Sequence, residues 1–335
     1  MKTAWYASPD IFDTLAGEWD TLVNPASPEL LFMSYDWQRI WWKHLGRGHL
    51  SIVTVRDDRG VLRGIGPWFI EQEGEQRAVR IIGSTDVVDY LDILVVPGYE
   101  QDVLSALLDF MLSQDAPQWD ILDLCNLPQN SPVLVLLPEL AKTKGLTVTV
   151  APLEECPIIN LPRSYEEYLG MLDKKQRHEL RRKRRRAQEM QAGWYIVGPE
   201  HHLDKEIDAF LELMAMSTTD KSAFLKEPGH LSFFKEIGPM MFEKGILELS
   251  FLTFEGRRAA SLWQFAYRDR MMLYNSGLNP VDFPGLSPGV VLLIYNIENA
   301  IQRHFKVYDF LRGSEEYKYR MGAQKTNVYN ITVYR

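Results

Sequence analysis

One arrangement of predicted elements occurs twice along this chain of 335 residues. Residues 51–70 predict a β-hairpin, because a β-branched run, a polar turn with Gly60 and a second apolar run follow one another. Residues 247–267 repeat this order around a charged turn with Gly256. The two turn glycines lie 196 residues apart. This repetition indicates a tandem duplication, which limits the possible folds more than any other feature of the chain.

Each hairpin leads into the same further elements. A third short strand ends at Gly83 in the first copy and at Gly277 in the second. An apolar helix follows, over residues 99–112 and 287–302, and then one more strand. Strands on both sides of a helix describe an α/β unit. We therefore expect two related α/β domains, each with a mixed sheet of the α+β kind.

The length and composition of the chain agree with two domains. With 46% hydrophobic residues the chain can bury an ample core, and a domain usually has roughly 100 to 200 residues. A predicted strand at 156–161 gives way to a helix, and this change marks the boundary. We expect one domain at 1–162 and the other at 163–335.

The cysteines, histidines and apolar runs limit the compartment. Cys125 and Cys156 are the only cysteines, and they show no disulfide or zinc spacing, which is typical of a reducing compartment. The histidines form no HxxxH group, so we expect no metal site. No apolar run reaches the roughly 18 residues of a membrane span, and the N-terminus has no signal-like apolar stretch. The sequence therefore predicts a cytoplasmic protein with no membrane span.

A short basic run stands out in an acidic chain. Residues 174–186 hold nine Lys or Arg and one acid, Glu179, whereas the whole chain has a net charge of -8. We expect the run to belong to a helix that begins after Ser164, an N-cap with Glu167 three positions later, and ends at Gly193. Three roles stay open: the run holds a phosphorylated ligand, docks on the acidic body of its own protein, or is a solvated helix face.

Several segments resemble a known family. The second half contains NSGLNP at 275–280, LSPGVVLL at 286–293 and YDFLRGSEEYKYRMG at 308–322. The first half contains FMSYDWQRIWWKHLG at 32–46 and GSTDVVDYLDI at 83–93. Together these segments resemble the acetyltransferase-like family that includes CelD-type cellulose-biosynthesis acetyltransferases and, more distantly, Fem peptidyltransferases. The resemblance implies two tandem domains of the GNAT acyltransferase fold, in agreement with the duplication.

The start of the helix at 287–302 is a candidate donor site. Ser287 can cap this helix, Pro288 suits its first position, and Gly289 permits close approach to the backbone. Free amides at a helix N-terminus bind phosphate, so a coenzyme A pyrophosphate would lie here in a GNAT-like domain. The usual pyrophosphate loop of that superfamily, with its spaced glycines, is absent.

The end of the preceding strand is a candidate acyl site. Asn275 and Ser276 stand where GNAT domains separate their strands to admit the acyl group. In such domains backbone amides, here those of residues 275–278, stabilise the tetrahedral oxyanion. An ordinary turn explains the same residues equally well, because Asn, Gly and Pro favour turns.

The motif at 308–322 supplies four more candidates. Tyr317 could protonate a departing thiolate, and Lys318 could hold a phosphate or carboxylate. Asp309 and Arg312 stand near the end of the predicted strand, and we expect them to contact substrate. The alternative is a surface turn with a solvated ion pair.

The acids at 86–92 are candidates for binding and activating the acceptor. Asp89 and Asp92 could act as a base if they approach each other, because mutual repulsion would raise one pKa. Tyr90 lies between them, and Asp86 precedes them. The resemblance places this segment where the first domain faces the acceptor. The acids could equally cap a turn.

The sequence therefore predicts an N-acyltransferase that moves an acyl group, acetyl in the simplest case, from an acyl-CoA thioester to an amine. The acceptor would be a small molecule or a cell-envelope precursor. One alternative is a Fem-like enzyme that takes its acyl group from aminoacyl-tRNA, bound through Lys174–Arg186. A second alternative is a non-catalytic partner in a polysaccharide-synthesis complex.

Overall fold

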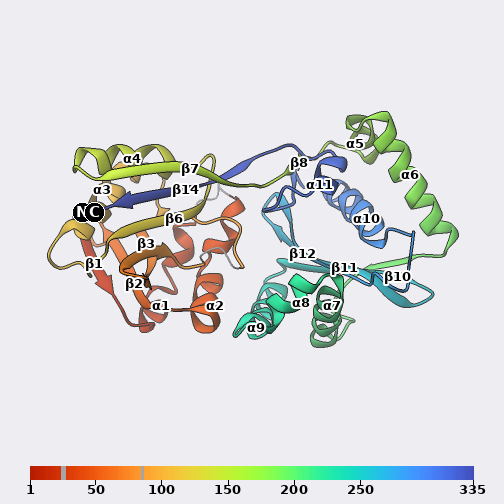
Figure 1. Ribbon diagram of the computed structural model, residues 1–335, viewed down its shortest axis with the longest axis horizontal. Helices are drawn as coiled ribbons and strands as arrows, with labels where there is room; N and C mark the ends of the chain where they lie inside the picture. The colour runs from red at the N-terminus through yellow and green to blue at the C-terminus, as the bar shows by residue number, and fades with distance from the viewer. Residues whose placement is uncertain (24–27, 84–86) are drawn as a thin grey trace. The chain divides into compact units, whose positions relative to one another are not determined.

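The computed structural model describes residues 1–23, 28–83 and 87–335, which form two compact units (Figure 1). The first unit consists of Met1–Glu155 with Thr326–Arg335, and the second of Cys156–Lys325. This division differs from the contiguous domains expected at 1–162 and 163–335. The last strand pairs within the first sheet, and the strand at 158–160 pairs within the second, so strand pairing moves both boundaries.

The first unit contains one sheet and four α-helices among its described residues. Its strands are β1 (Lys2–Tyr6), β2 (His49–Arg56), β3 (Leu62–Glu73), β4 (Gln76–Ile81), β5 (Leu94–Val95), β6 (Ile121–Pro128), β7 (Thr147–Glu155) and β14 (Asn327–Tyr334). Its helices are α1 (Asp10–Leu15), α2 (Tyr35–Leu45), α3 (Glu100–Leu112) and α4 (Val133–Thr143), with 3₁₀ segments η1 (Trp19–Thr21) and η2 (Pro28–Met33). The strand order is β1-β2-β3-β4-β6-β14-β7, and β5 pairs with β3. Only β4 and β6 pair in parallel among these described strands.

The second unit contains a six-stranded sheet in the order β8-β13-β12-β11-β10-β9. Its strands are β8 (Ile158–Asn160), β9 (Gly193–Ile196), β10 (Leu247–Phe254), β11 (Arg257–Tyr267), β12 (Arg270–Leu278) and β13 (Val307–Asp309). Its helices are α5 (Tyr165–Met171), α6 (Lys174–Glu189), α7 (Leu203–Ser217), α8 (Thr219–Lys226), α9 (His230–Glu243), α10 (Pro288–Gln302) and α11 (Glu316–Arg320). Helix α10 covers one face of this sheet, and α7, α8 and α9 lie on the other (Figure 1).

The expected duplication is confirmed in the order of elements. Strands β2, β3 and β4, helix α3 and strand β6 correspond to β10, β11 and β12, α10 and β13. In each copy the strand after the helix pairs in parallel with the third strand, Ile121 beside Ala78 and Val307 beside Arg270. Both hairpin turns place a glycine at positive φ, +83° at Gly60 and +74° at Gly256. Two mixed α/β sheets are therefore the observed fold class.

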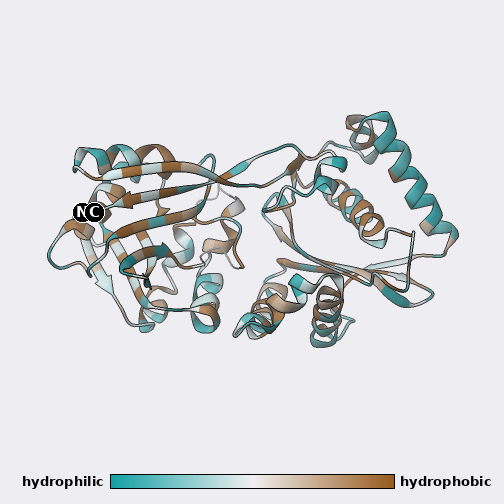
Figure 2. Cartoon of the chain, in the orientation of Figure 1, coloured by the Kyte–Doolittle hydropathy of each residue, from teal (hydrophilic) through white to brown (hydrophobic). Residues whose placement is uncertain are grey.

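The helices of the second unit differ sharply in how much they bury. Val291, Ile294 and Ile297 of α10 are fully buried against the sheet. Burial of one such side chain stabilises the fold by roughly 1.5–3 kcal/mol. Helix α6 buries only Leu180 and Ala187, and Figure 2 shows it as a largely hydrophilic ribbon. Its packing on the unit therefore depends on polar contacts more than on apolar area.

The helix expected to begin after Ser164 and end at Gly193 is two helices. Ser164 caps α5 as expected, accepting from the Glu167 amide at 3.2 Å. The chain then becomes extended at Leu172, whose side chain is 5% exposed in the core. Asp173 begins α6 as a second N-cap, accepting from the Gln176 amide at 2.8 Å. Gly193 is the first residue of β9. Burial of Leu172 and the new cap together explain the break.

Candidate functional site

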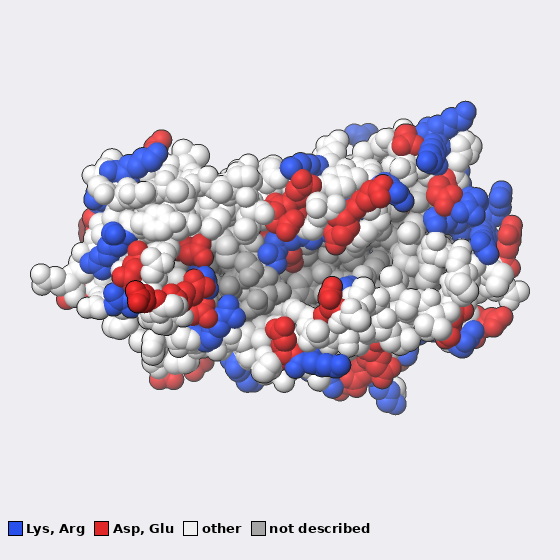
Figure 3. All heavy atoms as spheres, in the orientation of Figure 1, with Lys and Arg blue, Asp and Glu red and all other residues white. Residues whose placement is uncertain are grey.

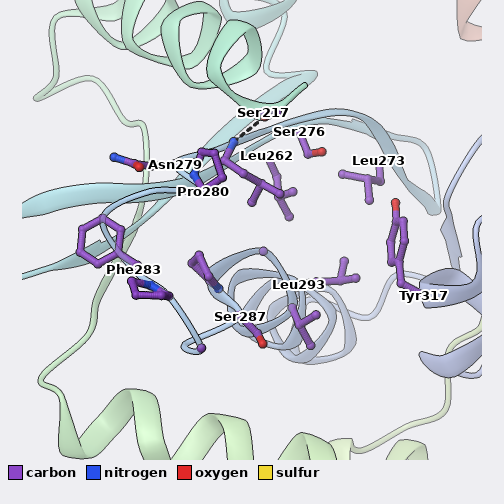
Figure 4. Close-up of a pocket in the computed structure, with 16 residues that line it drawn as sticks. Ser217, Leu262, Leu273, Ser276, Asn279, Pro280, Phe283, Ser287, Leu293 and Tyr317 are labelled. Carbon is purple, nitrogen blue, oxygen red and sulfur yellow. Dashed lines mark hydrogen bonds between the residues drawn. The ribbon is translucent and has the colours of Figure 1, made fainter. Parts of the chain in front are cut away.

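A cavity of about 480 Å³ lies in the second unit between β12 and the start of α10 (Figure 4). Its wall is mostly apolar, with a few polar groups. The cavity is lined by residues that include Ser276 and Leu278 of β12, Gly285 before α10, Ser287 and Gly289 at the start of α10, and Tyr317 of α11. A mostly apolar pocket with few polar groups is the usual form of a small-molecule site.

Strand β12 opens this cavity because it leaves its parallel partner early. It pairs with β13 only through Arg270, Met271 and Met272. Two residues later a β-bulge leaves Tyr274 between the paired positions Leu273 and Asn275. A bulge increases the local twist and bends the strand. The strands therefore separate where the cavity lies.

The start of α10 forms the second wall. Ser287 has φ +52° and ψ +53°, and no side chain caps the helix. The expected cap by Ser287 is therefore wrong: this left-handed conformation is unlike that of an N-cap residue, and the hydroxyl instead accepts from Lys183 Nζ at 2.5 Å. The helix also starts with Pro288, which has no amide hydrogen, and with Gly289, whose added Cβ would stand 2.8 Å from Leu278. These features leave an uncapped helix N-terminus at the cavity.

Two cations of α6 reach the same loop. Besides Lys183 at Ser287, Arg186 donates to the Gly285 carbonyl at 3.1 Å. Lys183 also lies 3.4 Å from Glu179, which partly offsets its charge. The positive end of the α10 dipole adds to the field of these cations. This corner of the cavity is suited to an anionic group.

Figure 3 shows Lys and Arg side chains gathered over α6, and the ion pairs divide the rest of the basic run into paired and unpaired cations. Arg184 is structural, because it pairs with Glu298 of α10 at 2.8 Å and lies over the Tyr165 ring. On the outer side, Arg182 donates to Glu179 and holds the pKa of that carboxyl at about 2. Arg181 and Arg185 also have acidic partners within 4 Å. Lys174, Lys175 and Arg177 have no ion-pair partner in the part of the chain that the structure describes. Docking on its own unit is thus one role of the run.

The predicted acyl site lies at the cavity, but its amides are partly occupied. Asn275 Oδ1 accepts from the Ser276 amide at 2.9 Å, and Ser217 Oγ accepts from the Leu278 amide at 2.7 Å. These two amides are not open to an oxyanion, which corrects the expectation for 275–278 on this point. The side chain of Ser276 itself lines the cavity (Figure 4).

Tyr317 and Lys318 are neighbours with different surroundings. Tyr317 lines the cavity, and its hydroxyl points toward β12 (Figure 4). The residue as a whole is 39% exposed, but loss of solvent around its hydroxyl raises its pKa, and the charge of Glu315 acts in the same direction. The phenol therefore keeps its proton over the physiological range.

The ammonium of Lys318 is buried and fully engaged. It donates to the carbonyls of Arg312 at 2.7 Å and Gly313 at 3.0 Å, and it pairs with Glu315 at 2.9 Å. These contacts use the three protons of a lysine. In this arrangement Lys318 holds the turn at 311–315 rather than presenting a charge to a ligand.

Asp309 and Arg312 do not line the described cavity. Asp309 is fully buried, and its carboxylate accepts from Arg270 at 2.7 Å and from the Leu311 amide at 2.8 Å. Arg312 is half-buried, and its carbonyl accepts from Lys318. The surroundings of both residues are those of groups that shape the end of β13.

Lys221 belongs to the site and was missed by the sequence analysis. From α8 its ammonium donates to the Ser276 carbonyl at 2.6 Å and lies 3.2 Å from the Ser276 hydroxyl. Burial lowers its pKa to about 8, and the charge of Glu315 opposes part of that shift. Lys221 and Ser276 are 55 residues apart, so no local pattern could have indicated the contact.

The predicted acceptor residues lie in the first unit. Asp92 is 6% exposed and accepts from the adjacent Ile93 amide at 2.9 Å. Asp89 is half-buried. Tyr90 is 3% exposed and packs near the Phe32 ring, as a core residue does. Asp86 lies outside the described residues. The roles assigned to these residues stay predictions.

Neither a metal-ligand cluster nor a membrane-spanning helix occurs among the described residues. Over residues 1–23, 28–83 and 87–335, no three His, Cys, Asp or Glu side chains gather as metal ligands would. Within the same residues no helix combines the length and the apolar character needed to span a bilayer.

Comparison with known proteins shows the fold and a domain family that matches part of the second unit. Residues 174–319 match the family of acetyltransferase (GNAT) domains. The structure of FemX is similar, with a TM-score of 0.65 at 12% identity over 98% of this chain and 97% of that one. A tandem GNAT protein from the clavulanic acid biosynthesis pathway gives a TM-score of 0.50 at 11% identity over 98% of both chains. No curated protein sequence matches.

These comparisons place the molecule in a class. L-PGS from Bacillus licheniformis has the same fold, with a TM-score of 0.53 at 10% identity over 93% of this chain and 92% of that one. Both units therefore have the fold of tandem GNAT proteins. Within the second unit, residues 174–319 are similar to acetyltransferase (GNAT) domains.

Proposed function

We propose that the second unit transfers an acyl group from an acyl-CoA thioester to an amine. The observation that carries this proposal is the apolar cavity, which joins the separated strands β12 and β13 to the uncapped start of α10. A thioester donor needs both parts, an apolar channel for its acyl and pantetheine groups and an anion site for its pyrophosphate. The two parts adjoin in one pocket.

The anion site would hold the pyrophosphate. No side chain caps the first turn of α10, and its amides and positive dipole end favour phosphate oxygens. Lys183 Nζ, 2.5 Å from Ser287 Oγ, adds a charged donor at the same place. Gly289 leaves room for close approach, because it lines the cavity without a side chain.

The transfer itself requires in-line approach and a proton for the leaving sulfur. The amine nitrogen attacks the carbonyl carbon, and the carbon–sulfur bond breaks as the new carbon–nitrogen bond is kept. Tyr317 is the proton donor in this proposal, because its hydroxyl points into the cavity and its raised pKa keeps the proton in place. Its phenolate then recovers a proton from the nitrogen.

The acceptor is an amine on a small molecule or on a cell-envelope precursor. We keep Asp89 and Asp92 of the first unit as candidate acceptor residues, on the basis of the family resemblance alone. Lys318 and Asp309 take structural roles in this proposal, because their charged groups are engaged within the protein.

A second candidate function is transfer from aminoacyl-tRNA. The observation that favours it is the unpaired state, among the described residues, of Lys174, Lys175 and Arg177 at the start of α6. Exposed cations of this kind attract a phosphate backbone, and the attraction weakens steeply with salt. This candidate predicts tRNA binding at low salt that Lys175→Glu reduces.

Direct binding of four probes separates these functions: acetyl-CoA, a long-chain acyl-CoA, free coenzyme A and bulk tRNA. A ligand that binds the folded state raises the melting temperature with its concentration. Stabilisation by coenzyme A species supports the proposal, and stabilisation by tRNA alone supports the second candidate. If none of the four binds, the non-catalytic partner is the remaining function.

Tyr317→Phe tests the chemical step with a matched control. We expect turnover to fall about 100-fold or more, since a general acid usually contributes about 100- to 10,000-fold, with little change in melting temperature. The control is Tyr334→Phe, an exposed tyrosine of the first unit, which should leave turnover unchanged. Equal losses of turnover and stability in Tyr317→Phe would contradict a direct role.

A further inference from the structure

Lys221 is a buried amine in an unusual position. It lies on α8, directly behind Ser276 of β12, and Ser276 lines the cavity. Within the described residues no carboxylate lies within ion-pair distance of its nitrogen. The charged group that acts on it is Glu315, whose carboxylate also pairs with Lys318 at 2.9 Å. On the adjoining α9, His230 is occupied with the Phe224 carbonyl at 2.7 Å.

The two oxygens of Ser276 suit both charge states of this amine. As an ammonium, Lys221 donates to the carbonyl at 2.6 Å and to the hydroxyl at 3.2 Å. As a neutral amine, it keeps the bond to the carbonyl and accepts a proton from the hydroxyl, because its lone pair then replaces one N–H. The contact therefore survives proton uptake and release without movement of the backbone.

We propose that Ser276 and Lys221 form a proton relay that removes the first proton from the acceptor ammonium in the cavity. This inference rests on the proposed acyl transfer at the same site. The Ser276 hydroxyl takes a proton from the acceptor nitrogen and passes its own to the Lys221 nitrogen. The products of this step are a neutral acceptor amine and a Lys221 ammonium, which later releases the proton to solvent.

The proton balance of the whole transfer then closes. An acceptor ammonium carries three protons and the amide product keeps one. The first lost proton goes through Ser276 to Lys221, and the second replaces the proton that Tyr317 gives to sulfur. Burial supports the relay, because it lowers the pKa of Lys221 to about 8 and so makes the neutral form available near neutral pH.

The test compares Lys221→Met, Lys221→Arg and Ser276→Ala with the unaltered chain, using the donor that it binds best and an amine that it acylates. In the unaltered chain we expect kcat/KM to rise with pH through a midpoint near pH 8 and to reach a plateau about one pH unit higher. In all three variants that limb should disappear, and kcat should fall about 100-fold at pH 8. Donor affinity should change less than about threefold.

Controls keep the result specific. Lys226→Met alters an exposed lysine at the end of the same helix and should leave the pH profile and kcat unchanged. Melting temperature and donor affinity show whether each variant is folded. Because Ser276→Ala keeps Lys221, it tests the relay even if the Lys221 variants fold poorly.

The possible outcomes distinguish a failure of the proton relay from a failure of the proposed acyl transfer. If Lys221→Arg keeps the kcat and the pH limb of the unaltered chain, Lys221 supplies only a positive charge and the relay is overturned while acyl transfer stands. If Ser276→Ala keeps the pH limb, the relay is overturned in the same way. An unaltered chain that binds no thioester and acylates no amine overturns the proposed function and the relay together.

Discussion

The two units have the same order of elements, but they differ in what lies beyond the paired part of their two parallel strands. In the second unit β12 and β13 pair over three residues, and a cavity lies beyond them. In the first unit β4 and β6 also pair over three residues. Beyond these residues, the segment that contains Val88 and Leu91 forms hydrogen bonds to β6 in place of β4. There the Leu91 amide donates to the Asn126 carbonyl at 3.0 Å, and the Asn126 side chain donates to the Val88 carbonyl at 3.1 Å. Val88 and Leu91 are buried core residues.

The helices that follow these strands differ in the charge at their start. Glu100 and Asp102 lie in the first turn of α3, whereas the first turn of α10 has Pro288 and Gly289 and no acid. Acidic side chains at a helix N-terminus offset the positive end of the helix dipole, which would otherwise attract phosphate. Lys183 adds positive charge at the start of α10. The two units share their scaffold, and the start of α10 lacks the acids that the start of α3 carries, which makes it the more favourable of the two for an anion.

The largest expected effect concerns the acid at the third position of each parallel strand. Asp309→Asn should cost about 3 kcal/mol of unfolding free energy, because its fully buried carboxylate pairs with Arg270. Asp123→Asn should cost about 1 kcal/mol or less, since Asp123 is part-exposed and Arg80 keeps Glu71 as a partner. Calorimetric unfolding of both variants measures the difference. Equal costs would show that the two strand ends are not distinguished by burial.

A side chain at the start of α10 should break donor binding. Gly289→Leu is expected to weaken acyl-CoA binding about 100-fold, equivalent to about 2.7 kcal/mol, because the new side chain enters the cavity near Leu278. Gln101→Leu makes the corresponding change at the second position of α3, where the side chain is exposed. Isothermal titration should show that only the first variant loses affinity. Equal affinity in both would remove the donor site from α10.

Charge reversal on α6 sharpens the electrostatic part of the comparison. Lys183→Glu should weaken acyl-CoA binding about tenfold, about 1.4 kcal/mol, because it places a carboxylate beside Ser287. Lys175→Glu changes the same charge on an exposed residue and should have no measurable effect on that affinity. Titrations at low and high salt test whether the loss of affinity is electrostatic, because salt should reduce the difference in acyl-CoA affinity between the two variants. The same loss in both variants would point to the net charge of α6 instead.

The smallest expected effect is a pH dependence of stability in the second unit. The folded pKa of Lys221, about 8, lies below its ordinary value, so the unfolded chain binds more protons between about pH 8 and 10.5. Stability should therefore rise with pH in that window by on the order of 1 kcal/mol, and below it the cost of the buried charge is fully present. In Lys221→Met the rise should be absent. Urea unfolding at pH 7.5, 9 and 10 measures it, and parallel curves for both proteins would contradict the burial of Lys221.

The sequence predicted much of the scaffold because the scaffold depends on local patterns. A few adjacent residues are enough to predict a hairpin with a turn glycine, an apolar helix or a helix that starts with Pro-Gly. The repeat of these features at a spacing near 195 residues indicated the duplication. Ser164 as a cap and Tyr317 at the cavity also followed from local motifs. Residue type and spacing therefore predicted the fold class, and the family resemblance indicated the segments of the second unit that line the cavity.

The tertiary structure decided what those residues do, because contacts between distant segments compete with local preference. The Ser287 hydroxyl, expected to cap α10, accepts a hydrogen bond from Lys183, which is 104 residues away. Strand β14 pairs with β6 and β7 of the first sheet, so the last residues of the chain belong to the first unit. The turn carbonyls and Glu315 occupied Lys318, which the motif alone had marked as a ligand cation. Lys221 became part of the site only because α8 places it behind Ser276. Local sequence records propensity, whereas proton and charge chemistry depend on which groups the fold buries together.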